Sequence, residues 1–453
     1  MTQEKPPPAP SSLRKYSGGR PRRGRGAAPP ETHARTPDPL APRRAALALL
    51  HAVMAEHRAL SDDAPALTRL PPEERARARR LAADTLRGLS RADRVLAPHL
   101  ARRPPLAVLN VLRLAVTEIA HGEAAHGAVG AAVDLVAADR RHRSLKALVN
   151  AVLRKAAPET AALWPGLPPP RLPGWLRKPL LRAHGAEAVA AIEAVHALPP
   201  PLDLTARDDP QALAQATGGT LLPGGSVRLH GPVQVSALPG YEAGTFWVQD
   251  AAAALPARVL APAPGERILD LCAAPGGKTL QLAAAGADVT AVDLSESRLA
   301  RLYANLARTG LTARVVAADA LAFTESGWDA ILLDAPCSAT GTIRRHPELP
   351  HIRDAATLPD LVALQARLID HALGLLAPGG RLVYATCSLL PEEGEQRIAA
   401  ALARHPGLRL APARAKGLPD GACNPDGSLR LRPDLWADRG GMDGFFIARL
   451  ERA

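Results

Sequence analysis

Two cysteines and four carboxylates stand where the strands of an α/β sheet are expected to end. Each follows a short apolar run, and the six residues are Asp270, Asp293, Asp319, Asp334, Cys337 and Cys387. In open α/β sheets, ligands bind beyond the carboxyl ends of the parallel strands, so these side chains should meet at one edge. Core packing does not require polar groups there. The spacing therefore predicts a catalytic or ligand-binding site.

The cysteines suggest covalent chemistry. A thiolate is nucleophilic near neutral pH and also leaves readily, so it suits reversible addition to an electron-poor ring carbon. Cys337 follows a proline and Cys387 follows a threonine, and the residues alone leave open which of them attacks. Cys272 is expected to contact a cofactor through its backbone, and Cys423 is expected to be structural. Because the cysteines show no CxxC spacing, no metal site is predicted.

The segment 266–293 reads as a strand, a glycine-rich loop, a helix and a second strand. Glycines let the backbone approach a ligand closely, and the helix N-terminus offers unpaired N–H groups. Asp293 lies where such folds place a carboxylate that binds ribose hydroxyls. The segment thus predicts an adenosine-cofactor site, formed by Cys272, Ala273, Ala274, Pro275, Gly276, Gly277, Lys278 and Asp293.

A P-loop NTPase is the alternative interpretation of the same loop. The pattern from Cys272 to Gly277-Lys278-Thr279 differs from a P-loop only at its first glycine, and Asp334 imitates the acidic strand end that holds magnesium. The missing glycine favours the adenosine-cofactor interpretation.

Composition limits the class of protein. The chain has 453 residues, 47% of them hydrophobic, which predicts several globular domains. Its formal charge of +12 predicts an anionic partner. Residues 1–44 contain ten Lys or Arg against three acidic residues and are rich in Pro and Gly, so a disordered basic tail is expected. No apolar run is long enough to span a membrane and no signal core is evident, so a cytoplasmic location is expected.

Residues 45–157 show helical spacing of apolar residues, with helices expected over 45–55, 75–89, 106–119 and 144–153. Prolines recur over 158–201 around one helical stretch, 175–197. Short strands are then expected at 202–206, 226–229 and 232–235, followed by 246–250. Residues 158–250 are therefore expected to be a linker and a small α+β module, and residues 251–453 a Rossmann-like α/β domain.

The helical region resembles the NusB-like RNA-binding domain. The matching motifs are Ala82-x4-Arg87-Gly88, Val111-Leu112-Arg113-Leu114-Ala115, Ala132-Val133-Asp134-Leu135-Val136 and Val149-Asn150-Ala151-Val152-Leu153-Arg154. That resemblance implies that surface arginines bind RNA, and the candidates are Arg43, Arg44, Arg79, Arg80 and Arg87.

The second half resembles the RsmB/Sun family of RNA cytosine-C5 methyltransferases. The motifs are DLCAAPGGKT, AVD, DA at 319–320, LLDAPCSATG, YATCS and DGFFIARL. The resemblance implies a class I methyltransferase domain, S-adenosylmethionine as cofactor and a cytosine of 16S rRNA as substrate. It also implies that Cys387 is the nucleophile, that Cys337 assists product release, that Asp334 contacts the base, and that Asp319 and Asp334 contact the cofactor. A monomer without a metal is expected.

Other functions predict different residues. An amino-methyltransferase would carry an aromatic residue after the Asp334 motif, where this chain has Ala335-Pro336-Cys337. A non-enzymatic NusB-like RNA-binding factor would use the N-terminal half only and would not need the polar strand ends. The segment 202–208 lacks the family's asparagine after its arginine, and the roles of Arg344, Arg345 and His346, in the expected substrate loop, stay open.

Overall fold

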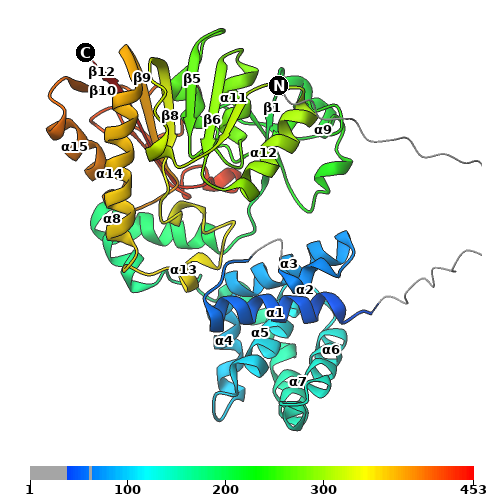
Figure 1. Cartoon of the computed structure of the whole chain (residues 1–453). Helices are drawn as coiled ribbons and strands as arrows, with labels where there is room; N and C mark the ends of the chain where they lie inside the picture. Colours follow the sequence, from blue (N-terminus) through cyan, green and yellow to red (C-terminus); the bar gives the residue numbers. More distant parts are fainter. Residues whose placement is uncertain (1–37, 61–63, 453) are drawn as a thin grey trace, which may run out of the picture. The chain divides into compact units, whose positions relative to one another are not determined.

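A computed structural model describes residues 38–60 and 64–452 of the chain. Along the sequence it contains a helical bundle, a small antiparallel sheet and a large mixed sheet flanked by helices (Figure 1). The predicted fold class is thereby confirmed. Within the described ranges, no helix is long and apolar enough to cross a membrane. The predicted disordered tail lies outside the described residues up to position 37.

The bundle consists of seven helices in the described part of residues 38–163, and its core is built from their apolar faces. α5 is the central helix, because every residue from Val108 to Ile119 is buried. The helices are α1 (Ala41–Glu56), α2 (Pro65–Thr68), α3 (Pro72–Arg87), α4 (Leu89–Leu96), α5 (Leu106–Ala120), α6 (Ala125–Ala138) and α7 (Lys146–Leu163).

The bundle differs from the sequence prediction in three ways. α1 begins at Ala41, so Arg43 and Arg44 belong to a helix rather than to the predicted tail; proline is tolerated in the first turn, where Pro42 lies. α2, α4 and α6 were not predicted, and α6 was missed because its Ala- and Gly-rich sequence gives little contrast between faces. α7 continues through Pro158 to Leu163, beyond the predicted end of this region.

A long helix, α8 (Gly174–His196), connects the bundle to a small sheet, and Gly185 interrupts it with a positive φ of 80°. The sheet has the order β2-β3-β1-β4, and α9 (Pro210–Thr217) packs against it. Its strands are β1 (Leu202–Ala206), β2 (Thr220–Leu221), β3 (Ser226–Leu229) and β4 (Phe246–Val248). The strand expected at 232–235 is absent: these described residues form a loop that leads into a short 3-10 helix.

The large sheet has the order β10-β12-β9-β8-β5-β6-β7, with β11 paired to β12. The strands from β9 to β7 are parallel, whereas β12 is antiparallel to β9. Strand order reverses between β5 and β8, the place where such sheets bind ligands. The strands are β5 (Arg267–Leu271), β6 (Asp288–Asp293), β7 (Arg314–Ala317), β8 (Trp328–Asp334), β9 (Leu376–Thr386), β10 (Leu408–Ala411), β11 (Leu429–Leu431) and β12 (Phe445–Arg452).

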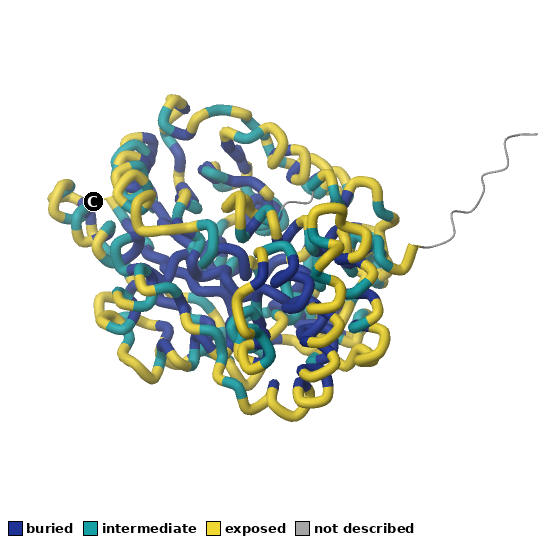
Figure 2. The backbone as a smooth tube through the Cα atoms, turned by 90° about the horizontal axis from the view of Figure 1, so that it is seen from below, coloured by how far each residue is buried: buried dark blue, intermediate teal, exposed yellow. Residues whose placement is uncertain are grey.

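Alternate residues of the central strands serve two separate cores, which explains why these strands are almost continuously apolar. Leu269 and Leu271 pack with α14, whereas Ile268 packs with α10. Figure 2 shows the buried residues concentrated in the interior of the fold and the exposed residues along its outer turns. The helices of this part are α10 (Leu255–Leu260), α11 (Gly277–Ala284), α12 (Glu296–Thr309), α13 (Leu349–Ile352), α14 (Leu358–Leu375) and α15 (Glu395–Arg404).

Gly341 lies beside the predicted catalytic loops, where two backbone segments approach each other closely. A Cβ at this position would lie 2.0 Å from the carbonyl oxygen of Gly444, and the Gly341 N–H donates to the carbonyl of Cys387. We expect Gly341→Ala to lower the free energy of unfolding by about 1–3 kcal/mol, since the backbones must separate.

Gly130 provides the matched control, because it lies in α6 and, apart from its chain neighbours and the nearby backbone of its own helix, nothing lies within 4 Å of the place that a Cβ would take. Gly130→Ala should raise the free energy of unfolding by about 0.5–1 kcal/mol. Urea denaturation of both variants measures the two effects. Equal stability of Gly341→Ala and the parent protein would contradict the close approach.

Candidate active site

The predicted polar residues gather at the carboxyl edge of the parallel strands. Asp293 and Asp334 are the last residues of β6 and β8, and Cys387 follows β9 directly. Asp270 is the penultimate residue of β5, Cys337 comes three residues after β8, and Asp319 lies two residues after β7. β5 and β8 are adjacent in the sheet, so Asp270 and Asp334 flank the point where strand order reverses.

The two cysteines are neighbours. The sulfur atoms of Cys337 and Cys387 are 3.4 Å apart, and both side chains are half-buried. The hydrogen bond to Cys387, together with burial, raises the pKa of the Cys337 thiol well above its usual range. Cys337 is therefore held as the protonated partner of the pair. For Cys272, burial raises the pKa of the thiol to about 12 and so disfavours its nucleophilic thiolate form.

Lys278 and Asp334 form an ion pair beside the cysteines. The ammonium nitrogen of Lys278 is 2.7 Å from an oxygen of Asp334 and 5.4 Å from the centre of the Phe445 ring. Burial disfavours the charged amine, but the negative charge of Asp334 outweighs burial and raises the pKa of Lys278. Asp334 keeps 30% of its side chain exposed, so one face of the pair remains accessible. Lys278 also interacts electrostatically with Cys387, so a fixed positive charge lies near that thiol.

The glycine-rich loop is braced by the carboxylate of Asp293, which accepts the N–H groups of Ala274 and Ser295 at 2.9 and 3.0 Å. Asp270 accepts the Thr279 hydroxyl at 2.6 Å with one oxygen, while its other oxygen is buried without a partner among the described residues. Burial raises the pKa of Asp270 to about 7. Asp319 is exposed and accepts the N–H of Leu321.

These groups suit S-adenosylmethionine. Carboxylates at the ends of neighbouring strands can accept hydrogen bonds from ribose hydroxyls and amino groups. The oxygen of Asp270 that has no partner among the described residues adds one buried polar atom to this edge. The residues predicted to hold the cofactor are Cys272 to Lys278, Asp293, Asp319 and Asp334. Among residues 38–60 and 64–452, no group of three His, Cys, Asp or Glu side chains is arranged to hold a metal ion.

Glu393 fixes the two cysteine loops relative to one another. Its buried carboxylate accepts the N–H and the hydroxyl of Ser338, at 2.9 and 2.5 Å, and an N–H of Gln365 at 3.0 Å. The Ser338 hydroxyl also lies 3.2 Å from that of Ser388. The residues next to Cys337 and Cys387 are therefore tied together. Glu393 was not predicted from the sequence, because acidic residues at 392, 393 and 395 look like an ordinary helix start.

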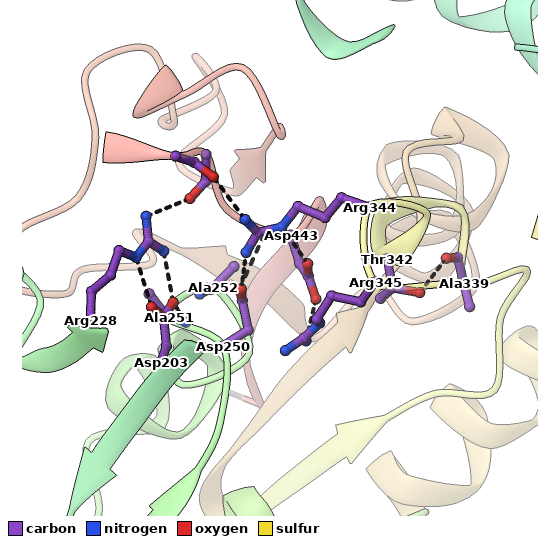
Figure 3. A network of polar contacts seen from close by, with 12 residues as sticks. Asp203, Arg228, Asp250, Ala251, Ala252, Ala339, Thr342, Arg344, Arg345 and Asp443 are labelled. Atoms are coloured by element: carbon purple, nitrogen blue, oxygen red, sulfur yellow. Dashed lines mark hydrogen bonds and ion pairs between the residues drawn. The ribbon is translucent and has the colours of Figure 1, made fainter. Parts of the chain in front are cut away.

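A second buried network lies behind the loop that follows Cys337 (Figure 3). The guanidinium of Arg344 is completely buried and donates to Asp443 at 2.9 Å, to Asp250 and to the carbonyl of Gly440. Burial alone would raise the pKa of Asp250, but the positive charges of Arg344 and Arg345 lower it to about 2. Arg344 thus stabilises the fold from a buried position. Its neighbour Arg345 forms an ion pair with Asp443.

Comparison with known proteins decides the family. Residues 257–451 match the family described as 16S rRNA methyltransferase RsmB/F, and residues 40–158 match the NusB family. Ribosomal RNA small subunit methyltransferase B of Pseudomonas putida is 38% identical over 90% of this chain and 98% of its own length. The chain belongs to the RsmB family. The protein of that name from Citrobacter koseri is 40% identical over 72% of this chain and 77% of its own length.

Solved structures agree with this membership in the RsmB family at the level of the fold. The crystal structure of PH0851 has a TM-score of 0.69, covers 92% of this chain and all of its own, and is 23% identical. NSun6 from Pyrococcus horikoshii, solved with SFG, has a TM-score of 0.54, covers 62% of this chain and 98% of its own, and is 22% identical. The predicted resemblance to the RsmB/Sun family is confirmed, and the P-loop alternative is excluded.

The arginines proposed for RNA binding in this RsmB-family chain are not equivalent. Arg43 is buried and bonds to the carboxylate of Glu118 at 2.9–3.1 Å, so it is a structural residue rather than a surface contact. Arg87 is mostly covered and reaches the carbonyl of Arg344. Arg80 is exposed on α3. The prediction for Arg43 was wrong because its helix position turns inward, which the arginine-rich sequence around it concealed.

The raised pKa of Asp270 makes the free energy of unfolding depend on pH. Its folded-state pKa of about 7 exceeds the unfolded value of 3.8, so the folded state binds the extra proton and stability falls as pH rises between these values. The ionised carboxylate costs up to about 4 kcal/mol above pH 7, at roughly 1.4 kcal/mol per pKa unit.

Asp270→Asn keeps an acceptor for Thr279 without the titrating proton. Its stability relative to the parent protein should therefore increase from pH 5 to pH 7.5. Urea denaturation at these two pH values, in cofactor-free protein, measures the change. A difference that does not vary with pH would contradict the raised pKa.

Proposed function

We propose that this protein methylates carbon 5 of a cytosine in small-subunit (16S) rRNA, with S-adenosylmethionine as methyl donor. The observation that carries the proposal is the pair of sulfur atoms 3.4 Å apart beside the Lys278–Asp334 ion pair. Membership in the RsmB family supports both the reaction class and the substrate. An NTPase would have no use for two adjacent thiols, and a non-enzymatic RNA-binding factor would not need the strand-end carboxylates.

Cys387 is assigned as the nucleophile. Carbon 5 of cytosine is weakly nucleophilic, so the Cys387 thiolate first forms a bond to carbon 6, which makes carbon 5 an enamine carbon. The raised pKa of Cys337 supports this choice, because a thiol that stays protonated can donate to the Cys387 sulfur but cannot itself attack. The Lys278 ammonium interacts favourably with negative charge on the Cys387 sulfur.

When bound, the cofactor supplies an electrophilic methyl group. The chain's own residues hold the base and move protons: the accessible face of Asp334 accepts a hydrogen bond from the cytosine amino group. After methylation a base removes the proton from carbon 5, the carbon–sulfur bond breaks, and Cys387 leaves as a thiolate. Cys337 is assigned to this release step as a hydrogen-bond donor rather than as the base: its protonated thiol lies 3.4 Å from the Cys387 sulfur and stabilises it as it leaves.

Three parts of the chain have separate roles in this proposed function. Residues 45–157 form an RNA-binding domain, and residues 158–250 join it to the catalytic residues 251–453. The enzyme acts as a monomer in the cytoplasm. Since a base must leave its stack to reach the thiols, the target cytosine is either unpaired or flipped out of a helix.

The two cysteines give the decisive test. Protein-free small-subunit rRNA that lacks the modification is incubated with labelled S-adenosylmethionine and either the parent protein or a variant. Cys387→Ala should transfer no methyl group above background, because carbon 5 is never activated. Cys337→Ala should transfer the methyl group and then retain the RNA, visible as a protein–RNA adduct on a denaturing gel.

Cys423→Ala is the matched control, since Cys423 is exposed and lies between β10 and β11 rather than after a parallel strand, and it should behave as the parent protein. If Cys337→Ala is inactive while Cys387→Ala still methylates, the two roles are exchanged. If the parent protein labels no RNA, the proposed function fails.

A further inference from the structure

The two active-site thiols are close enough to form a covalent bond with one another. The sulfur atoms of Cys337 and Cys387 are 3.4 Å apart, whereas a disulfide needs about 2.0 Å, so the sulfurs have to approach by about 1.4 Å. Rotation of the two side chains about their own torsions can supply a movement of this size. A disulfide between them is therefore within reach of the folded protein.

The backbone segments that carry these thiols are held together at several points. The Gly341 N–H donates to the Cys387 carbonyl at 2.9 Å. Glu393 accepts the Ser338 N–H with its carboxylate, and its carbonyl oxygen accepts the Thr386 hydroxyl at 3.1 Å. A disulfide would thus add one more link between two segments that the fold already joins.

The two thiols differ in their reactivity toward an oxidant. Lys278 interacts favourably with negative charge on the Cys387 sulfur, and the thiolate is the form that a peroxide oxidises. The hydrogen bond to Cys387, together with burial, raises the pKa of the Cys337 thiol, so this partner stays protonated. Both side chains are only half-buried, and Pro336 beside them is exposed, so a small peroxide can enter. A reactive thiol next to a resolving thiol is typical of redox-sensing cysteines.

We propose that Cys337 and Cys387 form a site of reversible oxidation, at which hydrogen peroxide converts the thiol pair into a disulfide. The Cys387 thiolate attacks one peroxide oxygen, the O–O bond breaks, and the other oxygen leaves as hydroxide. The sulfur loses two electrons and becomes a sulfenic acid. The Cys337 sulfur then attacks the Cys387 sulfur, the S–O bond breaks, and the Cys337 proton leaves with the hydroxyl group as water. A dithiol reductant reverses the bond by thiol–disulfide exchange and is itself oxidised.

The effect of this bond on activity rests on the proposed function. The disulfide occupies the sulfur of Cys387, so the oxidised protein cannot add to the cytosine ring. The bond also protects Cys387, because a sulfenic acid that meets a thiol becomes a disulfide instead of an irreversible sulfinic acid. Disulfides are transient in a reducing compartment, so methylation resumes there once the peroxide is gone.

The test detects the bond directly. Trypsin places each cysteine in a different peptide: Cys272 in residues 268–278, Cys337 in 315–344, Cys387 in 382–397 and Cys423 in 417–430. Full-length Cys423→Ala protein, which cannot form dimers through its exposed cysteine, is treated with hydrogen peroxide, alkylated after denaturation and digested. Mass spectrometry should find 315–344 linked to 382–397, with two hydrogen atoms fewer than the separate peptides. Treatment with dithiothreitol before alkylation should return both peptides in separate, alkylated form.

Substitution of either thiol separates their roles. In Cys337→Ala the sulfenic acid at Cys387 has no partner thiol, so peptide 382–397 should gain two oxygen atoms that dithiothreitol does not remove. In Cys387→Ala the thiol of Cys337 is the protonated one, and its peptide should be oxidised about tenfold more slowly than the Cys387 peptide in Cys337→Ala. Thermal melting checks that both variants are folded before peroxide is added.

Methyl transfer to unmodified small-subunit rRNA is measured on the same oxidised and reduced Cys423→Ala samples. The oxidised protein should work at less than about a tenth of the reduced rate, and dithiothreitol should restore it. Absence of the link, or a link from Cys387 to the Cys272 peptide instead, would overturn the proposal, as would a linked protein that methylates at the full rate. If the link forms but the reduced protein methylates no RNA, the proposed function fails and the oxidation site stands.

Discussion

The buried guanidinium of Arg344 is the interaction on which the arrangement of the catalytic region depends. It joins Asp250, at the exit of the small sheet, to Asp443, just before β12, while its own backbone carbonyl receives Arg87 from the bundle. A buried charge without its partner costs about 3–5 kcal/mol, so none of these segments can move away alone. Arg228 is a second buried arginine that joins separate segments: it donates to Asp203 and to the carbonyls of Arg439 and Gly441, each at 2.7 Å.

This rigidity matters because the chemistry is asymmetric. Two identical side chains 3.4 Å apart can play different roles only if their surroundings differ. Glu393 lies on the Cys337 side and adds negative charge there, which disfavours a thiolate at Cys337. Lys278 interacts favourably with the negative form of Cys387. In the proposed mechanism, the difference between the attacking and the releasing group is therefore set by the neighbouring residues, rather than by the cysteines themselves.

The strand ends were predictable from sequence, since apolar runs that stop at Asp293 or Asp334 obey the simple geometry of parallel sheets. The meeting of Cys337 and Cys387 could also be expected, because β8 and β9 are adjacent in sheets of this topology. Glu393, Asp443 and the buried state of Arg43 could not. Their partners lie 55, 99 and 75 residues away along the chain, and no local spacing encodes contacts that tertiary packing creates. α6 was missed for a related reason, because small residues are compatible with both helix and loop.

The position of β12 has a consequence for the order of events during synthesis. This strand lies between β9 and β10 inside the sheet, and its approach brings Asp443 to Arg344. A ribosome must add ninety-nine residues after Arg344 before that carboxylate exists. The bundle can complete its own core much earlier, since domains generally fold in order of emergence. A nascent chain would thus carry a finished helical domain while Arg344 still lacked the carboxylate of Asp443.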